Sequence, residues 1–187
     1  GKIIIAVADC TGHGVPGAFV SAMGISFLNE IVYTSKIKKE ALTPAKILNG
    51  LRNRMLHSIE STESDEEAYD GMDISICIID KEIKKYTYAG ALLSIIHVSK
   101  IHEEDTPIQV EQLKPDVHPV SMMDYGSHSY KDHIIPYDEG DMIYLYTDGY
   151  ADQFGGPNGR KFLNTNFRDL IQKISTEPLE IQEVKLE

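Results

Sequence analysis

The chain has 187 residues, of which 42% are hydrophobic and 25% charged. This composition is enough for the core of one globular domain, and it excludes a disordered or collagen-like chain. The formal net charge of −11 would repel phosphate backbones, which argues against nucleic acid as the main partner. The widely spaced Cys10 and Cys77 match no zinc-finger pattern, so we expect reduced thiols in a cytoplasmic setting. We find no signal peptide and no apolar run of about 18 residues, and we expect no membrane span.

The first elements of the chain are a strand and two helices. Residues 3–8 form a β-branched apolar run that predicts a buried strand. A glycine-rich turn follows at residues 9–17. The next segment, from about residue 16 to 34, is apolar over much of its circumference, which predicts a well-buried helix. Thr43 and Pro44 are typical of an N-cap and a first helical position. The helix that they begin carries one apolar stripe: Ile47, Leu48, Leu51, Met55 and Ile59.

After an acidic stretch at residues 60–68, which we interpret as a solvated loop, the hydrophobic period changes to two. Turn residues separate the segments that we predict as strands, which are 72–80, 85–88, 93–98, 108–113, 128–135 and 142–147. A final helix is predicted at residues 166–174. Two successive helices followed by a run of antiparallel strands indicate an α+β domain and not alternating βαβ units.

Gly12, Gly14 and Gly17 form a G-x-G-x-x-G pattern between the first strand and the first helix. This spacing is also typical of a dinucleotide-binding turn. That fold requires a second parallel strand soon after the helix. Here the helix is followed by a lysine-rich connection at residues 35–41 and then by another helix. We therefore keep dinucleotide binding only as a minor alternative.

Aspartates follow two of the predicted strands, at Asp9 and at Asp148, and each has a glycine close behind it. A carboxylate at the end of a buried strand is costly unless a cation or a donor pairs with it. Two such carboxylates from separate strands would suit Mg²⁺ or Mn²⁺, which prefer oxygen ligands. Since Asp-Gly pairs are also common turn formers, a purely structural role is the competing interpretation for each residue taken alone.

Residues 9–18, Asp-Cys-Thr-Gly-His-Gly-Val-Pro-Gly-Ala, resemble the Asp-x-x-Gly-His-Gly segment of bacterial stage-II-sporulation-E-like serine/threonine phosphatases. These belong to the metal-dependent PPM (type 2C-like) phosphatase superfamily. Three later segments, residues 70–75, 88–91 and 140–149, resemble the family's central strand, its next turn and its late Asp-Gly motif in the same order. The resemblance covers nearly the whole chain.

The resemblance implies a four-layer α-β-β-α sandwich of two antiparallel sheets flanked by helices, with residues 1–187 as a single domain. It also implies hydrolysis of phosphoserine or phosphothreonine by a water held between two Mn²⁺ or Mg²⁺ ions. Asp9 matches the carboxylate that bridges both metals, Cys10 the position whose backbone carbonyl completes one metal site, and Asp148 a ligand of the second metal.

Other residues of these motifs have less defined roles. Gly12, Gly14 and Gly149 would shape the turns near the substrate. His13 would either lie near the phosphate or have a structural role. For Asp70 and Asp73, in the central motif, we expect a part in turn geometry or contacts to the catalytic loop, not metal ligation.

The chain departs from the family pattern at both ends, since the first acidic strand motif and the closing Asp-Asp strand have no counterpart. We therefore expect this fragment alone to bind metal weakly and to have little or no activity. Sheet edges left without these strands would invite pairing with another chain, which makes a homodimer a further expectation.

The family resemblance implies partners for the longer protein. We expect a C-terminal output domain of a larger sensor protein that acts on a phosphorylated protein, such as an anti-sigma-factor antagonist. We expect it in the cytoplasm, including the cytoplasmic part of a membrane sensor. The alternative is a regulator of the same fold that binds a phosphoprotein without turnover. Retention of both Asp9 and Asp148 argues against this alternative.

Overall fold

The computed structural model describes residues 1–12, 14–58, 71–99, 108–122, 126, 128–155 and 159–187. Contacts between residues divide the chain into two compact units. The first unit comprises Gly1–Leu93 and Lys114–Pro136, and the second comprises Ser94–Leu113 and Tyr137–Glu187. The acidic stretch that we predict as a solvated loop lies outside the described residues, as do His13, Ile59 and Asp70.

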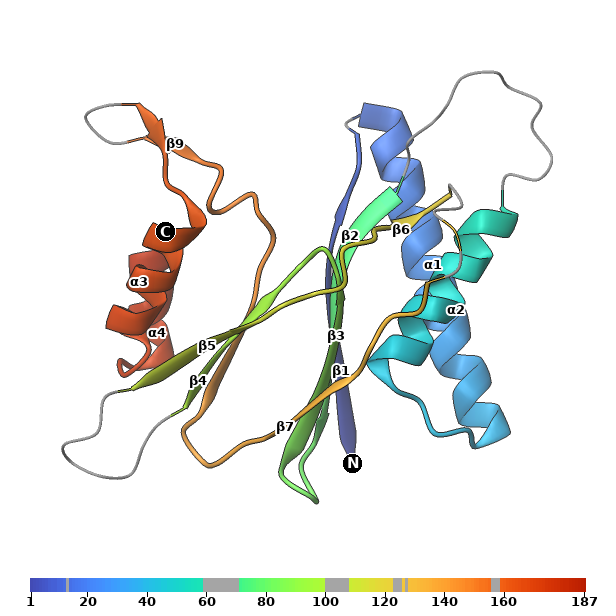
Figure 1. The fold of residues 1–187 in the computed structure, drawn as a ribbon, viewed down its shortest axis with the longest axis horizontal. Coiled ribbons are helices and arrows are strands. Elements are labelled where there is room, and N and C mark those ends of the chain that lie inside the picture. The colour runs from blue at the N-terminus through green and yellow to red at the C-terminus, as the bar shows by residue number, and fades with distance from the viewer. Residues whose placement is uncertain (13, 59–70, 100–107, 123–125, 127, 156–158) are drawn as a thin grey trace. The chain divides into compact units, whose positions relative to one another are not determined.

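The first unit is an antiparallel sheet with two helices packed against it (Figure 1). Four strands follow in the order β1-β2-β3-β7, and β6 also pairs with β2. The predicted segments are confirmed with shifted ends. The elements are β1 (Lys2–Cys10), α1 (Gly14–Lys38), α2 (Pro44–His57), β2 (Gly71–Asp80), β3 (Lys85–Ala91), β6 (Val120–Ser121) and β7 (His133–Pro136).

The core of the first unit lies between α2 and the central strands. Four residues of the predicted stripe are at most 1% exposed, namely Ile47, Leu48, Leu51 and Met55. They pack with Ile74 and Ile76 of β2, which are fully buried. A helix with one continuous apolar stripe folds in this way because only that face needs to leave water.

Helix α1 is buried along one stripe only, which includes Gly17, Val20, Gly24 and Ile31. The expected burial over most of its circumference is therefore wrong: Val15, Phe19 and Tyr33 are more than 60% exposed. By length and hydropathy, α1 also resembles a membrane-spanning helix, but its buried stripe belongs to the core of the first unit. The helix ends in a Schellman motif, in which Glu40 N–H donates to Ser35 O and Lys39 has a φ of 54°.

Strand β1 differs from the prediction of a buried strand. Ile3, Ile4 and Ile5 are 41, 39 and 37% exposed. The reason is position: β1 lies at the edge of its sheet, and β2 is its only partner among the described strands. The apolar run gave the correct type of element but not its place in the sheet, because an edge strand and a central strand share the same composition.

The predicted strand at 128–135 is shorter than expected, since β7 covers only His133–Pro136. The residues before it bond to other parts of the first unit. Asp132 Oδ1 accepts the backbone N–H of Ala45 at 2.8 Å. The hydroxyl of Tyr130 donates to Pro119 O at 2.9 Å. These bonds hold the segment against α2 and away from the strand ladder.

The second unit is a three-stranded antiparallel sheet in the order β5-β4-β8, with α3 packed on it. Phe167, Ile171 and Ile174 of α3 form a buried cluster with Ile96 and Val98 of β4. The elements are β4 (Ile95–Ser99), β5 (Gln109–Leu113), β8 (Met142–Leu145), β9 (Phe154–Gly155), β10 (Arg160–Lys161), α3 (Asn164–Ile174) and α4 (Leu179–Leu186).

Helix α4 and the β9–β10 hairpin were not predicted. The buried Gln182 anchors α4, since its Oε1 accepts the Tyr144 hydroxyl at 2.7 Å and its Nε2 donates to Glu177 O at 2.8 Å. Burial is the main cause that raises the pKa of Tyr144 above its usual value. The eight residues of α4 make only about two turns, which is too short for the apolar residues to show a helical period, and this explains why the helix was not predicted.

The N-cap of α2 provides a test of the predicted start of this helix. Thr43 Oγ1 accepts the backbone N–H of Lys46 at 3.3 Å. We expect Thr43→Ala to lower the free energy of unfolding by about 1 kcal/mol, because it removes a partner of the first helical turn. Urea denaturation followed by circular dichroism measures this. Thr43→Ser should retain wild-type stability, and equal losses in both variants would contradict a capping role.

Candidate functional site

The register of β1 on β2 places Asp9 directly opposite Asp73. Directly opposed residues of an antiparallel pair lie on the same face of the sheet, with Cβ atoms about 4.5–5.5 Å apart. The neighbouring pair, Cys10 opposite Met72, packs against the core on the helix side. Because side chains alternate along a strand, the two carboxylates lie on the face away from α1 and α2.

This pairing brings together residues that the sequence analysis treated separately. We expected Asp9 to bind metal, and Asp73 to take part in turn geometry or to contact the catalytic loop. The structure places Asp73 inside β2, half-buried and opposite Asp9. Antiparallel pairing of the first strand with residues 72–80 was the missing information, since each segment was recognised but their register was not.

The glycine-rich turn follows Asp9 at the end of β1. The backbone N–H of Thr11 donates to Gly71 O at 2.9 Å, which holds the turn against the start of β2. Gly12 and Gly14 have φ values of 91° and 69°, a region that other residues rarely adopt. Both glycines therefore shape the turn, as expected. His13, between them, is outside the described residues.

Gly17 allows this turn to fold back on the first turn of α1. A Cβ at position 17 would lie 2.8 Å from Gly12 O and 3.1 Å from its carbonyl carbon. Since these are backbone atoms, they cannot yield as a flexible side chain would. The turn therefore lies directly against the N-terminus of α1, where unpaired N–H groups and the helix dipole favour anions.

Cys10 ends β1 next to Asp9. Its side chain is half-buried and packs against the first unit's core, so its thiol lies on the opposite face of the sheet from Asp9. The thiol is therefore no candidate for the same cation as the Asp9 carboxylate. The backbone carbonyl remains the only group of Cys10 that fits the predicted role.

Asp148 lies in the second unit, beyond the end of β8 at Leu145. It begins a turn in which Asp152 N–H donates to Asp148 O at 2.9 Å. Gly149 is not among the described glycines with positive φ, and a Cβ there would meet only Thr147 Oγ1 at 3.3 Å. The expected sharp, glycine-dependent turn is therefore found at Gly12 and Gly14 but not at Gly149.

The expectation that both carboxylates are partly desolvated at the ends of buried strands is wrong. Asp9 and Asp148 are exposed, and neither strand that leads to them is fully buried. Within the described residues, His, Cys, Asp and Glu form no group of three or more suited to a metal ion. Since Asp9 and Asp148 belong to different units, their meeting at one metal pocket stays a prediction.

We expect Gly17→Ala to destabilise the first unit by about 1–3 kcal/mol, because the added Cβ overlaps the Gly12 carbonyl. This loss would exceed the helix-propensity gain of about 1 kcal/mol from replacing glycine by alanine. Chemical denaturation provides the measurement. Gly155→Ala is a matched control, since its Cβ meets nothing within 4 Å. A Gly17→Ala protein as stable as the wild type would contradict the close approach.

The two thiols give a second test, of the side-chain directions in β1 and β2. Burial raises the pKa of the Cys77 thiol to about 12, and this residue is 0% exposed. We expect a thiol reagent at pH 8 to modify Cys10 alone in the folded protein and both cysteines after unfolding, because thiolates react and buried thiols do not. The Cys10→Ser variant should not react while folded. Rapid reaction of that variant would contradict the placement of Cys77.

Comparisons with known proteins agree with this fold. The sequence profile of the family described as Stage II sporulation protein E (SpoIIE) matches residues 1–184. No curated protein sequence gave a match. The SiaA-PP2C domain of Pseudomonas aeruginosa is similar in structure, with a TM-score of 0.77 and 26% identity. The match covers 98% of this chain and 65% of that one, so the chain spans less than two thirds of that relative's length.

Two further solved structures show the same fold at lower identity. The RsbU and RsbW domains of Rv1364c from Mycobacterium tuberculosis match with a TM-score of 0.70 and 18% identity, over 99% of this chain and 47% of that chain. The PP2C phosphatase domain of SpoIIE from Bacillus subtilis, with a fragment of its regulatory domain, matches with a TM-score of 0.64 and 18% identity. This match covers 99% of this chain and 48% of that chain. The chain belongs to the SpoIIE family and has the PP2C phosphatase fold.

Proposed function

We propose that this chain is a metal-dependent protein serine/threonine phosphatase domain. The observation that carries the proposal is the position of Asp9 in a chain of the SpoIIE family. It lies at the end of β1, opposite Asp73 and beside the glycine turn that leads into α1. These elements combine carboxylate oxygens with a helix N-terminus, so a cation and a phosphate group could both be bound there.

The residues present fit Mn²⁺ or Mg²⁺. Asp9 and Asp73 supply oxygen donors on one face of the sheet, and the backbone carbonyl of Cys10 supplies another nearby. Hard divalent cations prefer such ligands to thiolates. Like charges directly opposite each other on a sheet are destabilising, and a cation held beside Asp9 and Asp73 would relieve that repulsion.

A pair of such cations, when bound, would supply a nucleophile at neutral pH and neutralise phosphoryl oxygens. The chain's own contribution is positioning. Asp9 and Asp148 would hold the cations, and the turn fixed by Gly12, Gly14 and Gly17 would keep the N-terminus of α1 toward the phosphate. A turn that is already ordered needs no reorganisation when substrate binds, which favours catalysis.

The substrate in this proposal is a phosphorylated signalling protein, for which an anti-sigma-factor antagonist is a candidate. The structure similar to this chain from Bacillus subtilis includes part of a regulatory domain. By analogy, that supports the proposal that this chain is the output domain of a larger cytoplasmic sensor protein.

A second candidate is a regulator that binds a phosphoprotein without turnover. One observation favours it: the glycine turn at the N-terminus of α1 offers N–H groups to a phosphate without any metal. A protein that lacked a complete metal site could keep the fold and the anion-binding turn without catalysing hydrolysis.

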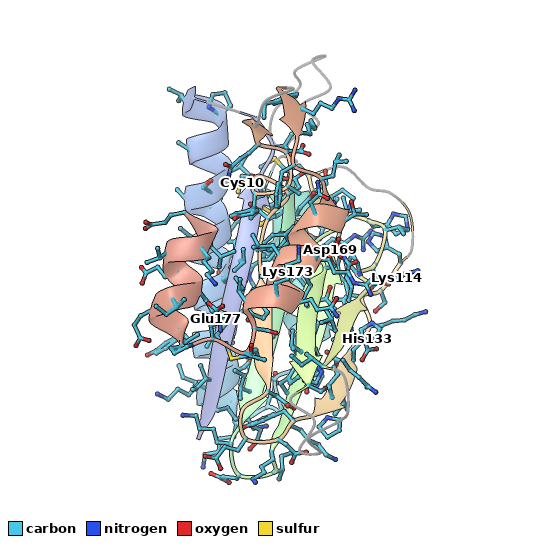
Figure 2. All side chains as sticks on the ribbon, turned by 90° about the vertical axis from the view of Figure 1, so that its left-hand side faces the viewer. Cys10, Lys114, His133, Asp169, Lys173 and Glu177 are labelled. Carbon is cyan, nitrogen blue, oxygen red and sulfur yellow. The ribbon has the colours of Figure 1, made fainter. Side chains whose placement is uncertain are left out.

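Substitution of the two proposed ligands separates the candidates. In the full-length protein with Mn²⁺, we expect Asp9→Asn and Asp148→Asn each to lower turnover of p-nitrophenyl phosphate at least about a hundredfold. The reason is that replacing residues that only hydrogen-bond to metal ligands already lowers metal affinity or activity by about 10–100-fold. A phosphoserine protein should show the same loss. The control is Asp169→Asn, at an exposed position on α3 (Figure 2), and it should retain wild-type activity.

Metal-independent turnover, or turnover unaffected by either substitution, would contradict the proposed enzyme. Binding of a phosphoserine protein without turnover, in the wild type as well as in the variants, would favour the regulator.

A further inference from the structure

The β9–β10 hairpin of the second unit borders a surface cavity of about 360 Å³. Tyr150, Phe154 and Phe162 give it aromatic walls, and Arg160, Lys161 and Gln153 give it polar groups. Phe154 is 72% exposed, so its ring is accessible to a molecule in the cavity.

The hairpin and the turn that begins at Asp148 form one hydrogen-bonded structure. The backbone N–H of Phe162 donates to Gln153 O at 2.9 Å, and that of Leu163 donates to Ala151 O at 2.8 Å. Asp152, at the end of the turn, forms an ion pair with Lys161, with Oδ2 and Nζ 2.9 Å apart. A molecule in this cavity would therefore lie against the same short segment that carries Asp148.

The walls of the cavity are held by packing. The ring of Tyr150 lies edge-on to Phe162, with centroids 5.8 Å apart, and it is tilted against Phe167 at 4.8 Å. Phe167 is 4% exposed and belongs to the buried cluster of α3. Aromatic rings fixed in this way lose little entropy when they contact a ligand, which favours recognition.

The charges of the hairpin are not equivalent. Lys161 pairs with Asp152 and lies 5.8 Å from the centre of the Phe154 ring. The exposed Arg160 has no partner of opposite charge among the described residues. Its guanidinium offers a planar set of donors that matches carboxylates and phosphates. Glu187 adds a negative charge to the lining of the cavity. Because Lys161 is already paired with Asp152, Arg160 is the cation left for an acidic ligand.

We propose that this cavity binds the substrate polypeptide next to its phosphorylated residue, with Arg160 paired to an acidic side chain of that polypeptide. An apolar side chain of the same polypeptide would pack against Tyr150 and Phe162. This inference rests on the proposed phosphatase function and adds a substrate preference to it. Because the chain carries a net charge of −11, an acidic polypeptide would be repelled elsewhere and favoured at a local cation.

The test measures binding apart from turnover. Fluorescence anisotropy would follow a labelled phosphoserine peptide with two flanking aspartates, its unphosphorylated form, and a form with alanines in place of the aspartates. We expect Arg160→Glu to weaken binding of both aspartate peptides about tenfold, the cost typical of losing one charged partner at an interface. The matched control is Arg168→Glu, which reverses the same charge at an exposed position of α3 that does not line the cavity. It should leave binding unchanged.

Kinetics keep this proposal distinguishable from the proposed function. In Arg160→Glu, the KM for the aspartate phosphopeptide should rise about tenfold while its kcat and the turnover of p-nitrophenyl phosphate stay unchanged. Equal loss of binding in the Arg160 and Arg168 variants would overturn the docking site, and so would equal affinity for the aspartate and alanine peptides. Absence of any p-nitrophenyl phosphate turnover in the full-length wild-type protein with Mn²⁺ would overturn the proposed enzyme, while Arg160-dependent peptide binding would still support the docking site.

Discussion

The antiparallel register of β1 on β2 is the constraint on which the candidate site depends. With Lys2 opposite Asp80 and Asp9 opposite Asp73, every second residue of β1 faces the helices. A slip of one residue would exchange the faces of all these side chains, placing Cys10 where Asp9 now lies. The buried Ile74 and Ile76 of β2 fix its orientation toward α2. The core of the first unit thus determines which face carries the carboxylates.

Local sequence signals predicted the elements better than their environment. The α2 helix was predicted with its cap and stripe, because Thr43, Pro44 and the apolar spacing act within a single helix. The exposure of β1 was not predicted, because it depends on which strands lie beside β1 in the sheet. For the same reason Asp9 was recognised from its motif, but its position opposite Asp73 was not predicted. That position depends on the register between β1 and β2, which neither strand specifies alone. The length of β7 depended on bonds from Asp132 to a helix far away in sequence.

The second unit positions Asp148 by a different means. Its turn does not rely on a glycine in the left-handed region, as the turn after Asp9 does. Packing of Tyr146 and Tyr150 on Phe167 fixes the residues on either side of it. Tyr146 also exchanges hydrogen bonds with Ser94 and Gln112 through its hydroxyl group. Tyr146 was interpreted as a residue of the strand predicted at 142–147, and Tyr150 lay outside it. Their part in holding the turn emerged only from the fold.

The candidate site in the first unit contains an arrangement that stability alone would not favour. Two carboxylates lie opposite each other on a sheet, where like charges are destabilising. The glycines beside them are required by the turn, because Gly12 and Gly14 have positive φ values and Gly17 leaves room for the Gly12 carbonyl. The buried stripe of α2, by contrast, follows every local rule of a stable helix. Natural sequences depart from those rules mainly at functional sites. The opposition of Asp9 and Asp73 is therefore an argument for function that is independent of the family match.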